Sequence, residues 1–495
     1  MRKKKLKDYE DRQKKPLFPL ASPGGEKGKE TDRNREYRLA AGFFVLIFLL
    51  MAGYLIYFQA ALSEDFINSP YNTRQDSFAD RVIRGDIVSS DSQLLAYTHV
   101  NEDGSSDRIY PYGNLFAHVV GFESNGKSGL EADANFLLLS SHEYFVTQMK
   151  NEFQGRKNQG DAIHTSLDTS LQSAAYYALG ENRGAVIAME PKTGRILAMV
   201  SKPDFDPNFM WQNWDYLVKD ENDSSLLNRA TNGAYPPGST FKLVTALDYY
   251  RRYKSFEGYS YYCEGEVTVG TDSIHCYEYS VHGQEDFYQA FANSCNCAFA
   301  MIGTVLGPWS LRETAQDLLF NRNLPIASYR QSQFTLGSRS DTRMIMQTAI
   351  GQGDTLVSPM HLALITCAVA NKGVLMKPSL IDEVVNASGD SVRAYHPEQA
   401  GVLMSQEEAD ALAGLMEAVV SYGTAVSLGW NGYTAAGKTG SAEYNEEGAS
   451  HSWFIGYCDT EDPKLVVSVI VEGGGAGSQT AVPIAKQLFD TYYYG

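Results

Sequence analysis

The sequence predicts an α+β fold in which one antiparallel sheet, flanked by helices, is assembled from both ends of a domain around an inserted helical subdomain. Two strand-like stretches, GAVIAME (184–190) and RILAMVS (195–201), follow a helix near the start of this domain. The pattern is then helical up to about residue 420. Three strand-like stretches (434–443, 452–458 and 464–472) and a closing helix end the chain. This order of helix, strands, helices, strands and helix places both groups of strands in one sheet.

Two segments of different character open the chain. Residues 1–38 hold 13 Lys/Arg against 7 Asp/Glu and few large apolar residues, which is typical of a disordered basic tail. Residues 39–62 carry no charge, and as a helix they would be about 36 Å long, enough to cross a bilayer. A cleaved signal peptide usually has a shorter apolar stretch nearer the start. The basic flank predicts a single-pass membrane protein with a cytoplasmic N-terminus and with residues 63–495 outside.

The charge is distributed unevenly along the chain. The net charge is −17 over 495 residues, and the first 38 residues contribute about +6, so the exterior part is strongly acidic. An acidic surface repels phosphate backbones, which argues against nucleic acid as a partner. With 43% hydrophobic residues, the exterior part can bury a large core.

The exterior part divides at a change of pattern near residue 160. Residues 63–160 are mixed and turn-rich, and residues 81–100 predict two short strands about a polar turn, so this part is expected to form a smaller β-rich pedestal domain. Residues 161–495 are the larger domain. Its elements are expected to be a capped helix at 167–179, the two strands joined by a turn at 191–194, helices starting at 239 and spanning 287–306, 311–319, 359–371 and 407–420, the three late strands and a helix at 481–492.

Six cysteines raise the question of a disulfide or a metal site. Cys263 and Cys276, outside the membrane, could pair with each other. Together with His275 and His282 they could instead hold zinc, but this spacing fits no standard zinc motif. The sequence therefore favours no metal and no cofactor, and leaves the disulfide open.

The stretch YPPGSTFKLVTALD (235–248) allows two interpretations of Ser239. A serine after a proline-rich turn and before an apolar run is a common helix cap. However, Lys242 lies three residues on, which on a helix places its amine on the same face, one turn away. A neutral amine there could take the hydroxyl proton and activate the serine as a nucleophile.

Two further short motifs give this pair a chemical context. They are Ser294-Cys295-Asn296, in a run expected to be helical, and Lys438-Thr439-Gly440-Ser441, at a predicted strand. Alone, each motif is weak, because Ser-x-x-Lys also occurs at 124–127 and Lys-Thr-Gly also occurs at 192–194. Both copies lie in predicted turns, where a structural explanation suffices.

In this order, Ser-x-x-Lys, Ser-x-Asn and Lys-Thr-Gly are the motif set of penicillin-binding transpeptidases and serine β-lactamases. Stretches such as NRATNGAYPPGSTFK, HGQEDFYQAFANSCNCAF, AAGKTGSAEYN and HSWFIGY resemble the class B penicillin-binding proteins, in that family's order, over residues 165–495. The preceding part resembles the family more weakly, at 84–87 and 128–131. The resemblance implies a serine β-lactamase/transpeptidase-like fold and a membrane-anchored peptidoglycan D,D-transpeptidase.

The resemblance also implies a role for each matching residue. Ser239 would attack the penultimate D-Ala carbonyl of a stem peptide, Lys242 would be the base, and Ser294 would relay the proton. Lys438 would help to bind the terminal carboxylate, and backbone N–H groups of Ser239 and Ser441 would form the oxyanion hole. The residues implied in substrate binding are Asn296, Thr439, Gly440 and Ser441.

Other functions remain open at this stage. A D,D-carboxypeptidase would share every site residue. A class A β-lactamase is disfavoured because Glu313 is the only Glu between Ser294 and Ile381, and it lies in a predicted amphipathic helix. A non-catalytic scaffold or a β-lactam sensor is the alternative from another class. The partners implied by the resemblance are stem peptides ending in D-Ala-D-Ala, β-lactams as covalent inhibitors, and a polytopic glycosyltransferase of the shape, elongation, division and sporulation (SEDS) class.

Overall fold

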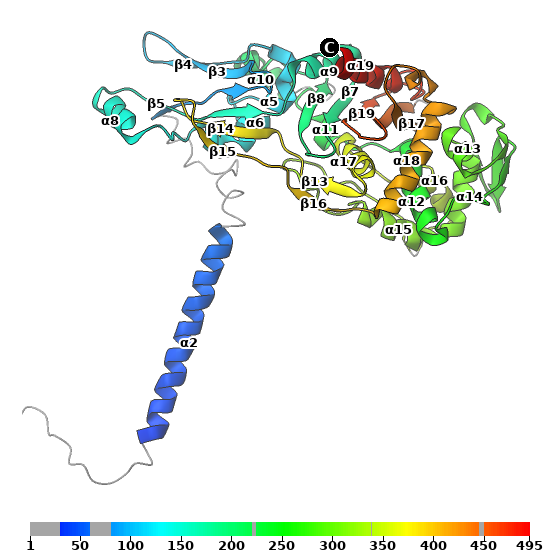
Figure 1. The fold of residues 1–495 in the computed structure, drawn as a ribbon, viewed down its shortest axis with the longest axis horizontal. Coiled ribbons are helices and arrows are strands. Elements are labelled where there is room, and N and C mark those ends of the chain that lie inside the picture. Colours follow the sequence, from blue (N-terminus) through cyan, green and yellow to red (C-terminus); the bar gives the residue numbers. More distant parts are fainter. Residues whose placement is uncertain (1–29, 60–80, 220–223, 338, 445–449) are drawn as a thin grey trace, which may run out of the picture. The chain divides into compact units, whose positions relative to one another are not determined.

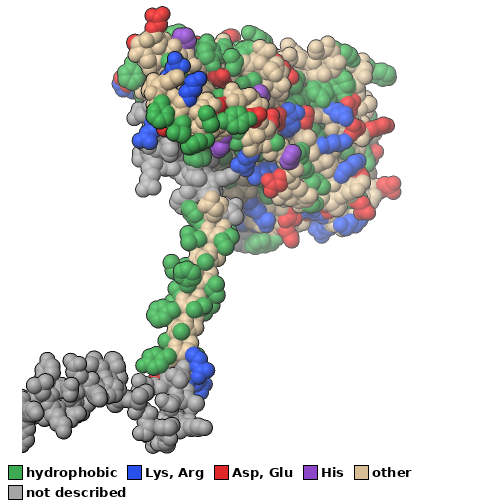
Figure 2. Space-filling model, turned by 60° about the vertical axis from the view of Figure 1, so that its left-hand side comes forward, with side chains coloured by type: hydrophobic (Ala, Val, Ile, Leu, Met, Phe, Trp, Pro, Cys, Tyr) green, Lys and Arg blue, Asp and Glu red, His purple; other side chains and the backbone are tan. Residues whose placement is uncertain are grey.

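The computed structural model describes residues 30–59, 81–219, 224–337, 339–444 and 450–495. The chain forms two compact units, Met1–Ile67 and Asn68–Gly495. In the first, helix α2 (Glu30–Tyr57) contains a 23-residue stretch, Arg35–Tyr57, with a mean hydropathy of 2.5 and none of its apolar window buried. Figure 2 shows hydrophobic side chains along this helix. It is long and apolar enough to cross a membrane.

This helix begins earlier than the predicted span. Residues 30–38, expected to be part of a disordered tail, continue the helix on its N-terminal side. Helix formation adds one hydrogen bond per residue once a nucleus exists, so a stable apolar helix extends readily into flanking polar residues. Residues 1–29 of the predicted tail and 60–62 of the predicted span lie outside the described residues.

The second unit contains the sheet that the sequence predicts. Five antiparallel strands lie in the order β17-β18-β19-β7-β8, so strands from both ends of the domain are neighbours (Figure 1). The predicted fold is therefore confirmed. The strands are β7 (Gly184–Met189), β8 (Ile196–Lys202), β17 (Ala435–Glu443), β18 (Ser450–Cys458) and β19 (Leu465–Val471).

Helices cover both faces of this sheet. Helix α9 (Thr169–Leu179), capped by Asp168, and helix α19 (Ala481–Tyr494) lie together on one face, and α17 (Pro359–Ala370) lies on the other (Figure 1). Because both faces are covered, β7, β8 and β19 are buried at every position and are mainly apolar. All residues of α17 are buried as well, so it is the central helix of the domain.

The helical subdomain differs from the prediction at two positions. The helix expected from Ser239 starts at Lys242, after the 3₁₀ turn η4 (Gly238–Phe241). The helix expected over 287–306 is broken, because Ser294 has a φ of 58° and cannot continue a right-handed helix. The helices of this part are α12 (Lys242–Tyr253), α13 (Phe287–Ala292), α14 (Asn296–Leu306), α15 (Pro308–Asp317), α16 (Thr342–Ala349) and α18 (Gln406–Ser421).

The domain also contains shorter helices, turns and strands. Helices α10 (Met210–Lys219) and α11 (Arg229–Asn232) follow the 3₁₀ turn η3 (Pro207–Phe209), and two further 3₁₀ turns are η5 (Tyr277–Tyr279) and η6 (Val426–Leu428). Four short strands lie between α12 and α13, namely β9 (Tyr261–Cys263), β10 (Glu266–Val269), β11 (Asp272–His275) and β12 (Gly283–Glu285). Strands β13 (Val374–Met376) and β16 (Gln399–Val402) pair with each other.

The first exterior part contains the two strands and the polar turn expected in residues 81–100. Its six-stranded sheet has the order β15-β14-β6-β2-β3-β4. Two of these strands, β14 and β15, come from residues 381–394, so the sheet crosses the predicted boundary at residue 160. The elements are β1 (Val82–Ile83), β2 (Ile87–Val88), β3 (Leu94–Val100), β4 (Ser106–Ile109), β5 (Asn158–Gln159), β6 (Ala162–Thr165), β14 (Ile381–Val385), β15 (Ser391–Ala394), η2 (Gly113–Phe116), α5 (Ala117–Val120), α6 (Gly129–Asp133), α7 (Asn135–Leu138) and α8 (Phe145–Phe153).

A buried ion cluster joins the two motifs of this part. Arg84 Nε lies 2.5 Å from Glu131 Oε2, and Arg108 Nε lies 2.8 Å from Glu131 Oε1. Burial raises the pKa of the Glu131 carboxyl, but the two guanidinium groups outweigh it and keep that pKa below its ordinary value. The weakly matching segments at 84–87 and 128–131 therefore contact each other through a charged core pair.

Candidate active site

Ser239 lies in a tightly packed 3₁₀ turn between strand β17 and a glycine turn. Gly238 has a φ of 54°, and its N–H donates to the carbonyl oxygen of Gly351 over 2.9 Å. A Cβ at Gly238 would lie 2.8 Å from the carbonyl oxygen of Ser441, so only glycine fits without a shift. Helix α12 has Phe241 as its N-cap residue and no side-chain cap. The helix-cap interpretation of Ser239 is therefore wrong.

The amine of Lys242 lies at the centre of the predicted site. Its Nζ donates to Ser239 Oγ at 3.1 Å, Ser294 Oγ at 3.2 Å and Asn296 Oδ1 at 2.7 Å. It also donates to the carbonyl oxygen of Ser294 at 2.6 Å. The side chain of Lys242 is fully buried, whereas Ser239 is partly exposed. A buried amine thus lies within hydrogen-bond distance of a partly exposed hydroxyl group.

Ser294 and Asn296 reach the amine because the helix is broken between them. Ser294 lies in the left-handed conformation, and Cys295 is the N-cap residue of α14, with its sulfur accepting from the N–H of Ala298. Asn296 Nδ2 donates to the carbonyl oxygen of His275 over 3.0 Å. This bond fixes the amide so that its oxygen faces Lys242.

The Lys-Thr-Gly segment of β17 closes the other side. Lys438 is fully buried, and its Nζ donates to Ser294 Oγ at 2.9 Å. Thr439 Oγ1 lies 2.5 Å from Thr424 Oγ1. A Cβ at Gly440 would approach Thr240 Cγ2 to 3.1 Å, so the small residue lets β17 pack against η4. Ser441 Oγ accepts from the N–H of Gly477 at 3.3 Å.

Burial shifts the titration of both lysines. It lowers the pKa of Lys242 to about 8, against partial opposition from neighbouring thiols, of which Cys295 has the largest effect. Burial and then the charge of Lys242 lower the pKa of Lys438 well below its ordinary value. Burial thus acts on both amines, whereas the repulsion between them falls on Lys438.

The structure thus brings the eight predicted site residues onto three neighbouring segments: η4–α12, the break before α14, and β17. The two repeated motifs do not reach this place, because Ser124 lies in a bend between α5 and α6 and Lys192 lies in the turn between β7 and β8. Sequence reasoning did not single out Thr424 or the carbonyl of His275, and it gave Gly351 no part in the site. Gly351 belongs to the glycine turn Gly351-Gln352-Gly353, a signal that could have identified it.

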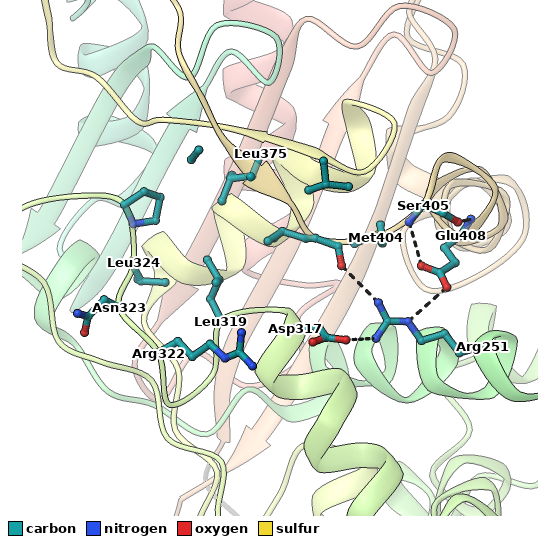
Figure 3. Close-up of a pocket in the computed structure, with 15 residues that line it drawn as sticks. Arg251, Asp317, Leu319, Arg322, Asn323, Leu324, Leu375, Met404, Ser405 and Glu408 are labelled. Atoms are coloured by element: carbon teal, nitrogen blue, oxygen red, sulfur yellow. Dashed lines mark hydrogen bonds and ion pairs between the residues drawn. The ribbon is translucent and has the colours of Figure 1, made fainter.

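A pocket elsewhere in the domain offers no comparable chemistry. It has a volume of about 530 Å³ and is lined by residues of α12, α15, β13, β16 and α18 (Figure 3). Its most prominent charge, Arg251, donates to Asp317 Oδ2 at 2.9 Å and to Glu408 Oε1 at 3.3 Å. Its guanidinium is therefore satisfied within the protein, and none of the predicted site residues lines this pocket.

A serine beside two buried lysines, next to a five-stranded antiparallel sheet with an inserted helical subdomain, is the arrangement that the motif set of penicillin-binding transpeptidases and serine β-lactamases predicts. The chain belongs to the penicillin-binding transpeptidase family: the family model for the penicillin binding protein transpeptidase domain matches residues 184–490, and that for the penicillin binding protein A dimerisation domain matches residues 84–163.

Similar proteins agree with this assignment. The peptidoglycan D,D-transpeptidase PbpA of Mycolicibacterium smegmatis is 32% identical over 487 residues, which cover 91% of this chain and 96% of that protein. The ceftriaxone acyl-enzyme complex of penicillin-binding protein A from M. tuberculosis has a TM-score of 0.77 at 28% identity, covering 84% of this chain and 99% of that chain. A D,D-transpeptidase domain from Eggerthella lenta has a TM-score of 0.76 at 28% identity, covering 83% and 98%.

Proposed function

We propose that this chain is a peptidoglycan D,D-transpeptidase in which Ser239 is the nucleophile and Lys242 is the base that activates it. The observation that carries the proposal is the hydrogen-bonded series Ser239–Lys242–Ser294–Lys438 around an amine that burial makes easier to deprotonate. An ordinary lysine is charged at neutral pH and cannot accept a proton, so its burial here is the feature that supports catalysis.

In the first half-reaction, Ser239 Oγ attacks the carbonyl carbon of the penultimate D-Ala of a stem peptide. Lys242 Nζ takes the hydroxyl proton as the new C–O bond forms. The C–N bond to the terminal D-Ala then breaks, and the leaving amine receives a proton through Ser294 Oγ. In the second half-reaction, an amine of a neighbouring stem peptide attacks the ester, gives up a proton and restores the Ser239 hydroxyl.

The remaining residues would hold the substrate during these steps. Backbone N–H groups of Ser239 and Ser441 would stabilise the oxyanion, and each such donor is worth about 3 kcal/mol in related sites. Lys438 and Thr439 would bind the terminal carboxylate, Gly440 would let the substrate backbone approach the strand, and Asn296 would hold the substrate amide. A β-lactam would acylate the same serine. Its leaving group would stay tethered to the acyl group after the ring opens.

Helix α2 supports a membrane location for the activity. We infer that this helix anchors the protein in the cell membrane, with residues 1–38 in the cytoplasm and the two exterior domains, 63–160 and 161–495, outside. The basic residues before the apolar stretch support this orientation. By family analogy, the first exterior domain and the membrane helix would contact a SEDS-class glycosyltransferase.

The experiment that tests the function uses the full chain purified in detergent. We expect a fluorescent penicillin to label it covalently and the label to persist for hours. A donor peptide ending in D-Ala-D-Ala, supplied with an acceptor amine, should give free D-Ala and a cross-linked product in equal amounts. D-Ala without cross-linked product would instead identify a D,D-carboxypeptidase, and loss of the label within seconds would identify a β-lactamase.

The rate of acylation should rise with pH through the pKa of Lys242. A base acts in its neutral form, so below a pKa of about 8 the rate should increase about tenfold per pH unit and then level off above it. The initial rate of penicillin labelling between about pH 6 and about pH 10 measures this dependence. A rate that is flat over this range would contradict the assignment of Lys242 as the base.

A further inference from the structure

Four side chains with metal-binding atoms meet beside the active site. Cys263 ends strand β9, Cys276 follows β11 and His282 precedes β12, so all three lie on the strand segment between α12 and α13. Cys295 belongs to the break between α13 and α14. The three sulfurs and the Nδ1 of His282 all lie within 4.8 Å of one another.

The spacing of these atoms matches a tetrahedral zinc site. With Zn–S distances of about 2.3 Å and a Zn–N distance of about 2.0 Å, tetrahedral ligands lie about 3.8 Å apart for two sulfurs and about 3.5 Å apart for sulfur and nitrogen. Cys276 Sγ lies 3.7 Å from Cys263 Sγ and 3.8 Å from Cys295 Sγ. His282 Nδ1 lies 3.5 Å from Cys263 Sγ and 3.7 Å from Cys276 Sγ. Four of the six separations are thus close to the tetrahedral values, and the other two are at most 4.8 Å.

The surroundings of the sulfurs suit thiolate ligands. The N–H of Gly265 donates to Cys263 Sγ over 3.4 Å, and the N–H of Ala298 donates to Cys295 Sγ over 3.5 Å. A fifth sulfur, that of Cys297, accepts from Cys276 Sγ over 3.5 Å but does not belong to the group of four. Donors around the ligands stabilise the negative charge of metal-bound sulfur and orient it.

We propose that Cys263, Cys276, His282 and Cys295 bind one Zn²⁺ as a closed structural site. Three sulfurs and one imidazole nitrogen form a ligand set typical of structural zinc, with no position left open for water. On binding, the three thiols release their protons to solvent. The group differs from the set that the sequence considered in two respects, since His275 lies outside it and Cys295 belongs to it.

The site would position part of the catalytic machinery, an inference that rests on the proposed function. Cys295 lies between Ser294 and Asn296, both of which contact Lys242. The zinc would fasten this segment to the strands between α12 and α13, whose His275 carbonyl also accepts from Asn296. A displacement of catalytic groups by about 1 Å reduces rates on the order of 10²-fold.

The test is the metal content of the full chain, purified in detergent without chelators, measured by plasma mass spectrometry. We expect one zinc per chain, lost in Cys263→Ser and in Cys295→Ser. Cys297→Ser and Cys458→Ser are the matched controls, since both remove a buried thiol outside the group, and they should keep the zinc. Zinc retained in Cys295→Ser, or a wild type that contains none and takes up none, would overturn the site.

A second measurement on the wild type covers ligand variants that fail to fold. Titration of the thiols with an organomercurial should release one zinc per chain, detected with a colorimetric indicator. Chelated protein should lose acylation on the order of 10²-fold and regain it with added Zn²⁺. A Cys263–Cys276 disulfide in the folded protein would contradict the site. Since metal content is measured independently of acylation, an inactive protein with one zinc would refute the proposed function and leave the site intact.

Discussion

Replacing Ser239 with alanine should abolish covalent labelling of the full chain by fluorescent penicillin. The substitution removes the oxygen that forms the acyl bond, and serine hydrolases lose roughly 10⁶-fold in kcat when their nucleophile is deleted. The fold should tolerate the change, because Ser239 is partly exposed and does not cap helix α12. Denaturing gels of labelled wild type and Ser239→Ala, with circular dichroism to check folding, measure the effect.

The chain contains its own control for this experiment. Ser124 begins a second Ser-x-x-Lys sequence, 124–127, which lies in a bend away from β17, so Ser124→Ala should label like the wild type. Label retained in Ser239→Ala would move the nucleophile elsewhere and remove the basis of the mechanism. Loss of the label in Ser124→Ala would show that Ser124 takes part in acylation despite its position in the bend.

The sheet of the larger domain could be predicted because its strands are local patterns. Strands such as β19 and β7 are buried at every position and almost wholly apolar, and the turn at 191–194 marks where β7 ends. Their pairing was inferred from chain order, since helices at both ends of a domain must cover one sheet. Sheet membership of β14 and β15 was not predicted, because β14 pairs with β6 more than 200 residues earlier, β15 joins the sheet only through β14, and no local signal records that pairing.

The site was predicted by its motifs, but its geometry was not. A serine at φ 58° has no distinct signature in an otherwise helical run such as YQAFANSCNCAF, so the break that lets Ser294 and Asn296 face Lys242 was missed. The sequence considered three members of the cysteine group, Cys263, Cys276 and His282, but not Cys295. Cys295 lies at the break before α14, and its approach to the other three depends on how β9, β11 and β12 fold back onto α14.

Replacing Lys242 with methionine should slow acylation by about 10²- to 10⁴-fold while the protein stays folded. The amine is the hydrogen-bond partner of Ser239 Oγ at 3.1 Å, and a positioned base contributes rate enhancements of this size. Methionine has a similar volume and fits a fully buried position, although Asn296 Oδ1 loses its donor. The rate constant of penicillin labelling at saturating protein concentration measures the effect, and Lys127→Met is the matched control.

The pH profile separates a chemical role of Lys242 from a structural one. If the amine acts as the base, the residual rate in Lys242→Met should lose the rise through about pH 8 that the wild type shows. If the amine mainly holds Ser294 and Asn296 in place, the rate should fall but keep its dependence on pH, because the true base would still titrate. Lys438 is the other amine that could serve, since it also reaches Ser294 Oγ, at 2.9 Å. A Lys438→Met variant that retains the rise through about pH 8 would assign the base to Lys242 alone.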